Sequence, residues 1–178
     1  MNKNNKIEDS LNKIFSTSGY KMVDVSSKEA THRKALATGE IILSSEVIKM
    51  IKNKKMPKGE PLAIAEVSGI NGVKKTSELI PLCHPLSLDH ISIHTEIDES
   101  KKSIIVYCLV SANSKTGVEM EALSGVSSAL LAIYDLSKIV QPNLKISNTK
   151  LLVKSGGKKG LWTNPDGIPD KVKNILKI

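Results

Sequence analysis

The chain has 178 residues, near the commonest size of a single domain and too few for two comfortable ones. Hydrophobic residues make up 40% and charged residues 25%, a balance that excludes an intrinsically disordered chain. No apolar run approaches the ~18 residues that span a bilayer, and residues 1–10 lack the apolar core of a secretion signal. We therefore expect a cytoplasmic protein with no membrane partner.

Lysine and arginine outnumber the acidic residues, 26 against 18, which gives a formal net charge of +8. Such a surface suits nucleic acid, an anionic membrane or a phosphate-rich small molecule. Arg33 is the only arginine, and reading guanine edges relies on arginine, whereas lysines serve well as point charges on phosphates. Aromatic residues, at 3%, are also too few for extensive base stacking. The composition favours a phosphorylated ligand over nucleic acid, with a merely solvated basic surface as the simplest alternative.

We expect residues 1–20 to form a flexible N-terminal arm, residues 21–160 a single domain and residues 161–178 a C-terminal tail. Within the domain, hydrophobic periodicity and capping signals predict a strand at 33–43, then a short helix capped by Ser44 or Ser45 and ending at about residue 52, and a helix at 61–79. Strands at 88–98 and 103–112, a helix at 117–140 and a strand at 145–153 follow. This β-α-β-β-α-β order with one extra helix predicts an α+β fold, a ferredoxin-like antiparallel sheet with helices on one face.

The longest predicted helix carries a polar stripe. At about 100° per residue, Glu121, Ser124, Ser128 and Asp135 fall on one side, with Lys138 beside them and apolar residues opposite. A solvated polar face is the simpler interpretation. Small serines between widely spaced charges instead favour a face that something approaches closely, and both interpretations stay open.

The dipeptide Cys83-His84 lies between Pro81 and Pro85, which predicts an irregular, braced loop. Adjacent Cys and His cannot easily bind one metal ion, and no paired ligand spacing accompanies them, so we predict no metal site. A histidine in such a loop can bind a ligand or act as an acid, and a structural role is equally compatible with the pattern.

Several lysines lie beside glycines, most notably in Lys154-Ser155-Gly156-Gly157. No Walker phosphate-binding loop is present. Thr116 and Gly117, however, open the longest predicted helix, where free backbone N–H groups attract anions. These lysines could therefore clasp phosphates, although loop lysines are commonly only solvated.

Taken together, these segments resemble the molybdenum cofactor biosynthesis protein C family, the cyclic pyranopterin monophosphate synthases. The most specific segments are Lys-Thr-Ser-Glu-Leu-Ile-Pro-Leu-Cys-His-Pro-Leu at 75–86 and Glu-Met-Glu at 119–121. Further resembling segments lie at 22–26, 31–35, 115–123, 133–135 and 154–158. The resemblance runs from about residue 20 to residue 160, so residues 21–160 would form the catalytic domain.

The resemblance implies a homohexamer, a trimer of dimers, that converts (8S)-3′,8-cyclo-7,8-dihydroguanosine 5′-triphosphate to cyclic pyranopterin monophosphate and pyrophosphate. It implies no cofactor, apart from Mg²⁺ that could accompany the triphosphate. It assigns catalysis to Asp135, Lys138 and Lys58. The residues expected to bind substrate, the last two of them phosphate-facing cations, are Leu82, Cys83, His84, Met120, Glu121, Glu119, Arg33 and Lys154.

The expected chemistry fits these residue types. Ring rearrangement needs proton donors and acceptors, and crowding with cations or burial would lower the pKa of a lysine towards neutrality. Asp135, one helical turn before Lys138, can orient its ammonium group. Because the motif residues are spread over several loops and a helix, we expect the active site between subunits.

Two functions of other classes remain as alternatives. A basic nucleic-acid-binding domain could use the same sheet, but the aromatic ribonucleoprotein motif is missing and Phe15 is the only Phe. A structural subunit of a larger complex is the other alternative.

Overall fold

The computed structural model of the chain describes residues 7, 10, 13, 19–158 and 160–177. The arm expected at residues 1–20 therefore lies mostly outside the described residues. The elements are β1 (Thr31–Ile42), α2 (Ser45–Lys52), α3 (Pro61–Lys74), α4 (Thr76–Leu79), β2 (His90–Asp98), β3 (Ser103–Ser114), α5 (Glu119–Ser137), β4 (Lys145–Ser155), β5 (Trp162–Thr163) and α6 (Asp170–Leu176).

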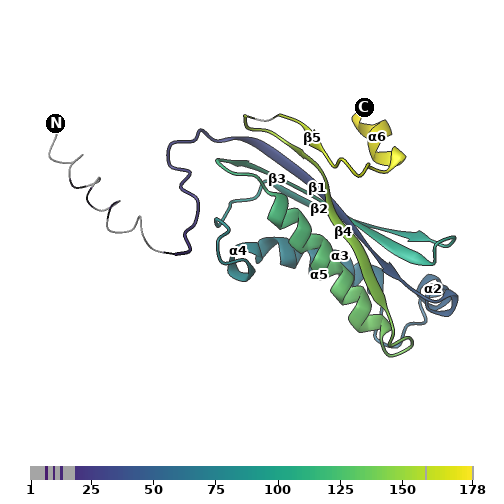
Figure 1. Cartoon of the computed structure of the whole chain (residues 1–178). Coiled ribbons are helices and arrows are strands. Elements are labelled where there is room, and N and C mark those ends of the chain that lie inside the picture. The colour runs from purple at the N-terminus through teal and green to yellow at the C-terminus, as the bar shows by residue number, and fades with distance from the viewer. Residues whose placement is uncertain (1–6, 8–9, 11–12, 14–18, 159, 178) are drawn as a thin grey trace.

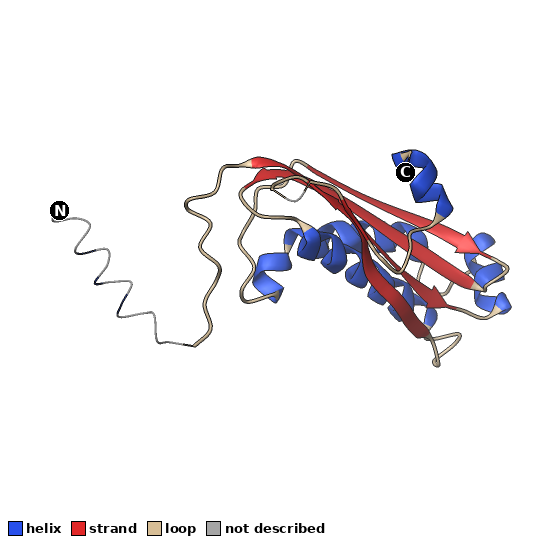
Figure 2. Cartoon of the chain, turned by 45° about the horizontal axis from the view of Figure 1, so that its top comes forward, coloured by secondary structure: helices blue, strands red, loops and turns tan. Residues whose placement is uncertain are grey.

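The strands form one antiparallel sheet in the order β2-β3-β1-β4-β5, with α3 and α5 side by side on one face (Figure 1). The first four strands and these two helices have the β-α-β-β-α-β connection, and α2 is the extra helix. The predicted α+β, ferredoxin-like fold is confirmed. Figure 2 shows that the C-terminal helix α6 lies on the other side of the sheet.

One predicted helix is divided in two. The sequence pattern indicates a helix at 61–79, whereas the structure ends α3 at Lys74 and begins the short α4 at Thr76. The buried hydroxyl of Thr76 donates to the carbonyl oxygen of Val73 at 2.9 Å. Side-chain bonds of this kind compete with the regular helical ladder, which explains the break.

Helices α3 and α5 are in unusually close contact because small residues face one another. A Cβ atom added to Gly72 would lie 2.5 Å from the Cβ of Ser128 and 2.9 Å from the carbonyl oxygen of Ser124. A Cβ added to Gly69 would lie 3.2 Å from the carbonyl oxygen of Gly125. The prediction that something approaches this serine face closely is confirmed, and what approaches it is the neighbouring helix α3.

The core lies between the sheet and these two helices and is almost entirely aliphatic. Burying one such side chain is worth about 1.5–3 kcal/mol. Its largest fully buried members include Ile41, Val47, Ile104, Val126, Leu130 and Ile133. The last three belong to the apolar face predicted for α5, which is confirmed.

The C-terminal segment adds a second, smaller apolar cluster on the opposite face of the sheet. Ile168 and Val172 are buried there together with Leu152 and Val153 of β4. Leu36 of β1 packs against this cluster. The segment after Gly160 therefore follows the sheet closely.

Candidate functional site

A hollow of about 190 Å³ lies where the loop after α4 meets the start of α5. Pro81 and Pro85 restrict the loop, and the Cys83 N–H donates to the carbonyl oxygen of Ile80 at 3.0 Å. Six of the residues predicted to bind substrate line this hollow: Leu82, Cys83, His84, Glu119, Met120 and Glu121.

A second hollow, of about 140 Å³, shares Gly117 and Glu119 with the first. Its cationic lining residues are Arg33, Lys34, Lys154 and Lys158. All eight residues predicted to bind substrate therefore lie around two adjoining hollows at the N-terminal end of α5. Free N–H groups and the dipole of a 19-residue helix favour anions at this end.

The glycine-rich turn after β4 shapes the cationic hollow. Gly156 and Gly157 have φ values of +100° and +69°, which side-chain-bearing residues rarely adopt. A Cβ atom on Gly157 would collide with the guanidinium group of Arg33, and one on Gly156 with the carbonyl oxygen of His32. The two glycines therefore allow the turn to lie directly against the arginine.

Lys34 and Lys158 are functional candidates that the sequence reasoning missed as site residues, although both lie in the resembling segments 31–35 and 154–158. Lys158 directly follows the glycines of the stretch that the sequence already links to phosphate binding. Nothing local distinguishes Lys34, because only the pairing of β1 with β4, Lys34 opposite Ser155, brings it to this hollow.

The two hollows meet at an ion pair. The Lys154 ammonium lies 3.0 Å from Oε1 of Glu119, and both side chains are partly buried, with exposed fractions of 38% and 29%. An anion that enters the cationic hollow would compete with Glu119 for this ammonium group.

Glu121 is the most deeply buried charged residue in the described part of the chain, with only 4% of its surface exposed. Burial raises the pKa of its carboxyl group, and the nearby Glu119 carboxylate adds to the increase. Burial also raises the pKa of the neighbouring Cys83 thiol, helped by the negative charge of Glu121. The Cys83 thiol is therefore suited to packing or weak hydrogen bonding rather than to attack as a thiolate.

The three residues predicted to be catalytic also come together, at the other end of α5. Asp135 accepts hydrogen bonds on both carboxylate oxygens, from Lys138 Nζ at 2.7 Å and from Lys58 Nζ at 3.0 Å. Lys58 lies in the loop between α2 and α3, so the cluster joins residues 77 positions apart. We call Lys58, Asp135 and Lys138 the lysine–aspartate cluster.

The groups of the lysine–aspartate cluster stabilise one another in their charged forms. The hydrogen bond from Lys138, and then that from Lys58, keeps the pKa of Asp135 below its ordinary value. The hydrogen bond to Asp135 in turn raises the pKa of Lys138. The expectation of a lowered lysine pKa is wrong for Lys138, because a carboxylate is its partner and half of its side chain is exposed.

The lysine–aspartate cluster and the two hollows are far apart within one chain. Asp135 lies sixteen positions after Glu119 on α5, which at the helical rise corresponds to about 24 Å. The structure thus brings the predicted substrate-binding residues together and the predicted catalytic residues together, but it does not join the two groups.

Residues 22–157 match the model of the MoaC family. The chain belongs to the MoaC family. A relative from Chloroflexus aurantiacus named cyclic pyranopterin monophosphate synthase is 43% identical over 145 residues, 82% of this chain and 89% of the relative. One of that name from Clostridium perfringens is 48% identical over 139 residues, 78% of this chain and 88% of the relative. A molybdenum cofactor biosynthesis bifunctional protein from Synechococcus elongatus is 43% identical over 149 residues. The match covers 84% of this chain and 47% of that protein.

Membership of the MoaC family supports an enzymatic role in molybdenum cofactor biosynthesis. The matched segment contains all eleven predicted site residues, from Arg33 to Lys154. It ends before β5 and α6, so the docked C-terminal segment lies outside the part that identifies the family.

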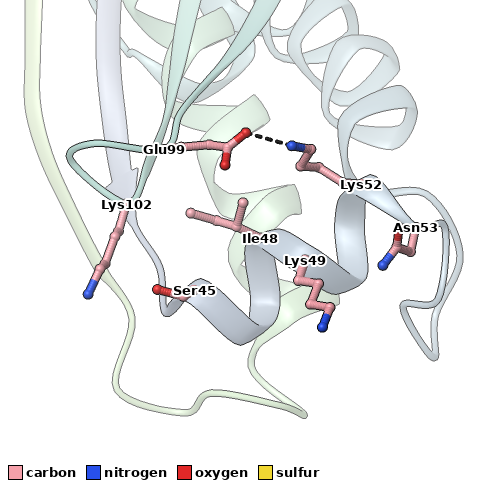
Figure 3. A pocket seen from close by; sticks show the side chains of 7 residues that line it. All are labelled: Ser45, Ile48, Lys49, Lys52, Asn53, Glu99 and Lys102. Carbon is pink, nitrogen blue, oxygen red and sulfur yellow. Dashed lines mark hydrogen bonds and ion pairs between the residues drawn. The ribbon is translucent and has the colours of Figure 1, made fainter.

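A hollow of about 370 Å³ near α2 contains none of the predicted site residues. Figure 3 shows that the Lys49 and Lys102 side chains extend away from one another, while Lys52 pairs with Glu99. These lysine side chains therefore do not converge on one point.

Two further findings concern the described residues. They include no group of three or more His, Cys, Asp and Glu side chains that could hold a metal ion. Within the same part of the chain, every helix is too short or too polar to cross a membrane.

Proposed function

We propose that the chain converts (8S)-3′,8-cyclo-7,8-dihydroguanosine 5′-triphosphate to cyclic pyranopterin monophosphate and pyrophosphate, by lysine and aspartate acid–base catalysis. The observation that carries the proposal is the lysine–aspartate cluster, found in a chain whose relatives are named cyclic pyranopterin monophosphate synthase. Two ammonium groups on one accessible carboxylate suit a reaction in which protons move and phosphate charge develops.

The hollow beside the braced loop suits the guanine-derived ring. Leu82 and Met120 supply apolar surface, and His84 and Glu121 supply polar groups. Because burial raises the pKa of Glu121, its carboxyl group can keep a proton closer to neutral pH than an exposed one can. A protonated carboxyl both donates and accepts hydrogen bonds, which matches the mixed edge of a purine-like ring.

The adjoining cationic hollow suits the triphosphate. Arg33 and Lys154, together with Lys34 and Lys158, surround it, and the N-terminus of α5 opens towards it through Gly117. Several cations around one hollow neutralise a polyphosphate far better than any single one of them.

The lysine–aspartate cluster serves the chemical steps. In the phosphate step a substrate hydroxyl oxygen attacks the α-phosphorus, the bond to the oxygen that bridges the β-phosphate breaks, and the hydroxyl proton passes to solvent water. Lys138, which Asp135 keeps protonated, stabilises the negative charge of the departing pyrophosphate. Lys58, on the other oxygen of Asp135, provides a second ammonium group at the same place.

We infer that the complete site is formed between two copies of the chain, in a homohexamer built as a trimer of dimers. The separation of about 24 Å within one chain supports this, because a substrate in the hollows cannot reach the Asp135 of its own chain. Exposed apolar residues on the helical layer also favour assembly: Ile64, Val67 and Leu131 are 45%, 59% and 61% exposed.

Mixing two inactive variants tests this arrangement. Asp135→Asn damages the lysine–aspartate cluster and Lys154→Met damages the cationic hollow. If each site combines the cationic hollow of one copy with the lysine–aspartate cluster of another, half of the dimers in an equal mixture contain one copy of each variant. In such a dimer one of the two sites is built from two undamaged parts. Co-refolded variants should then recover about a quarter of the wild-type release of pyrophosphate.

The matched control combines Asp135→Asn with Lys138→Met, which lie in the same cluster. No pairing then restores an intact cluster, so the mixture should stay inactive. Recovery in this control, or none in the test mixture, would overturn the shared site. Wild-type protein that releases no pyrophosphate from the cyclised nucleotide would overturn the proposed function itself.

A further inference from the structure

The ammonium group of Lys154 has two neighbours that differ in kind. One is the Glu119 carboxylate at 3.0 Å, and the other is the ring of Trp162, whose centroid lies 5.7 Å from Nζ. A ring face attracts a cation without neutralising it. An incoming anion can replace the Glu119 carboxylate as the partner of the Lys154 ammonium. The Trp162 ring can stay in contact with the ammonium during this replacement.

Trp162 is held in place by its backbone. In the short strand β5 it pairs directly with Lys154 of β4, and Thr163 pairs with Val153. Asn164 continues the attachment: its backbone N–H donates to the carbonyl oxygen of Leu152 and its side-chain amide to that of Leu151, both at 2.8 Å. The ring is therefore positioned by the edge of the sheet.

The rest of the C-terminal segment anchors this strand. Ile168 and Val172 are buried against the far face of the sheet. Lys171 pairs with Glu96 of β2 at 2.8 Å. These contacts tie the segment to the four strands β1 to β4, so the position of the Trp162 ring depends on the same framework as the cationic hollow.

We propose that Trp162 is a positioning residue that holds the Lys154 ammonium towards an oligophosphate in the cationic hollow. A lysine side chain has four rotatable bonds, so an unsupported ammonium would lose orientational freedom when it binds phosphate. The ring removes part of that freedom in advance, which is preorganisation. The inference deepens the proposed function and rests on it for the identity of the anion, but not for the binding of an oligophosphate.

Inorganic tripolyphosphate tests the proposal without turnover. Titration calorimetry should show binding to Trp162→Leu weakened about three- to tenfold, the loss expected from one cation–π contact. Trp162→Phe, which keeps a ring face, should recover part of the affinity. In a Lys154→Met background, Trp162→Leu should cause no further loss, because the ring then has no cation to hold.

Two controls separate positioning from general damage. Trp162 is the only tryptophan of the chain, so its fluorescence reports directly on this contact. Tripolyphosphate should change that emission in the wild type and not in Lys154→Met. Lys101→Met removes an exposed lysine that pairs with Asp98 beside the turn between β2 and β3 and should bind tripolyphosphate as the wild type does.

With the cyclised nucleotide as substrate, Trp162→Leu should raise KM and leave kcat within about twofold, since the ring does not touch the reacting atoms. Three results would each overturn the positioning role. They are an unchanged tripolyphosphate affinity in Trp162→Leu, an equal loss from Trp162→Leu in the wild type and in Lys154→Met, and a wild type that binds no tripolyphosphate. Active wild-type protein with any of these results would leave the proposed function standing. Wild-type protein that binds tripolyphosphate but releases no pyrophosphate would overturn the function and not this contact.

Discussion

Lys138 donates a hydrogen bond across one turn of α5 to Asp135, with 2.7 Å between Nζ and Oδ1. The pair lies at the end of the helix, where half of each side chain is exposed. Each residue therefore sets the charge and direction of the other while contributing nothing to the core. Such an arrangement couples the two residues in function and leaves them nearly independent of the fold.

Single and double variants should show this coupling. Asp135→Asn and Lys138→Met are each expected to lower kcat by about a hundredfold or more, because each removes a group that orients or transfers a proton. The double variant should be little worse than either single one, as for residues that act as a unit. Thermal unfolding should change little. Multiplicative losses would contradict the coupling, and a fully active Lys138→Met would overturn the site assignment.

His84→Ala should weaken substrate binding and leave the fold intact. His84 lines the hollow from a loop that Pro81 and Pro85 already restrict. The loss of one hydrogen bond should raise KM between a few-fold and about tenfold. KM and Tm measured on the same preparation check this. A Tm that falls sharply would instead show that His84 is structural.

Glu121→Gln should stabilise the protein increasingly as the pH rises. Burial raises the folded-state pKa of Glu121 above its ordinary value of 4.5. The folded protein therefore holds this proton more tightly than the unfolded chain, and stability falls as the pH rises from the unfolded towards the folded pKa. Glutamine carries no such charge, so its Tm advantage should be larger near about pH 8 than near about pH 4. A difference that is constant with pH would contradict this prediction.

Gly72→Ala should destabilise the contact between α3 and α5. The added methyl group would lie 2.5 Å from the Cβ of Ser128. Overpacking of this kind costs about 1–3 kcal/mol in the free energy of unfolding, measured by denaturant titration.

Adding Ser128→Gly should recover part of that loss, because it removes the atoms that collide. The exposed Ser127→Ala on the same helix is the control and should change stability by less than about 0.5 kcal/mol. A Gly72→Ala variant as stable as this control would contradict the close packing.

Local patterns in the sequence were sufficient for the order of the main elements. Alternation along 88–98 and 103–112 and the helical period along 117–140 depend on neighbouring residues, so they can be recognised without the fold. The boundaries shifted where a tertiary or capping interaction intervened, as at Thr76, whose hydroxyl bond to Val73 separates α3 from α4. The candidate site residues came from motifs that match a family, and the structure gathers all eight substrate-binding candidates around two adjoining hollows.

Only the tertiary structure shows which remote residues lie opposite a given side chain. Serines on one face of a helix have the same spacing whether a ligand or another helix lies opposite them. Here the close approach of Gly72 on α3 shows that the neighbour is a helix. Likewise, Trp162 looks like an isolated residue of a tail until strand pairing places it beside Lys154. Sequence by itself determines local conformation and residue chemistry, because both depend on covalent neighbours. Distances between remote residues depend on how the sheet and helices pack, which is why the separation of the lysine–aspartate cluster from the hollows emerged only from the tertiary structure.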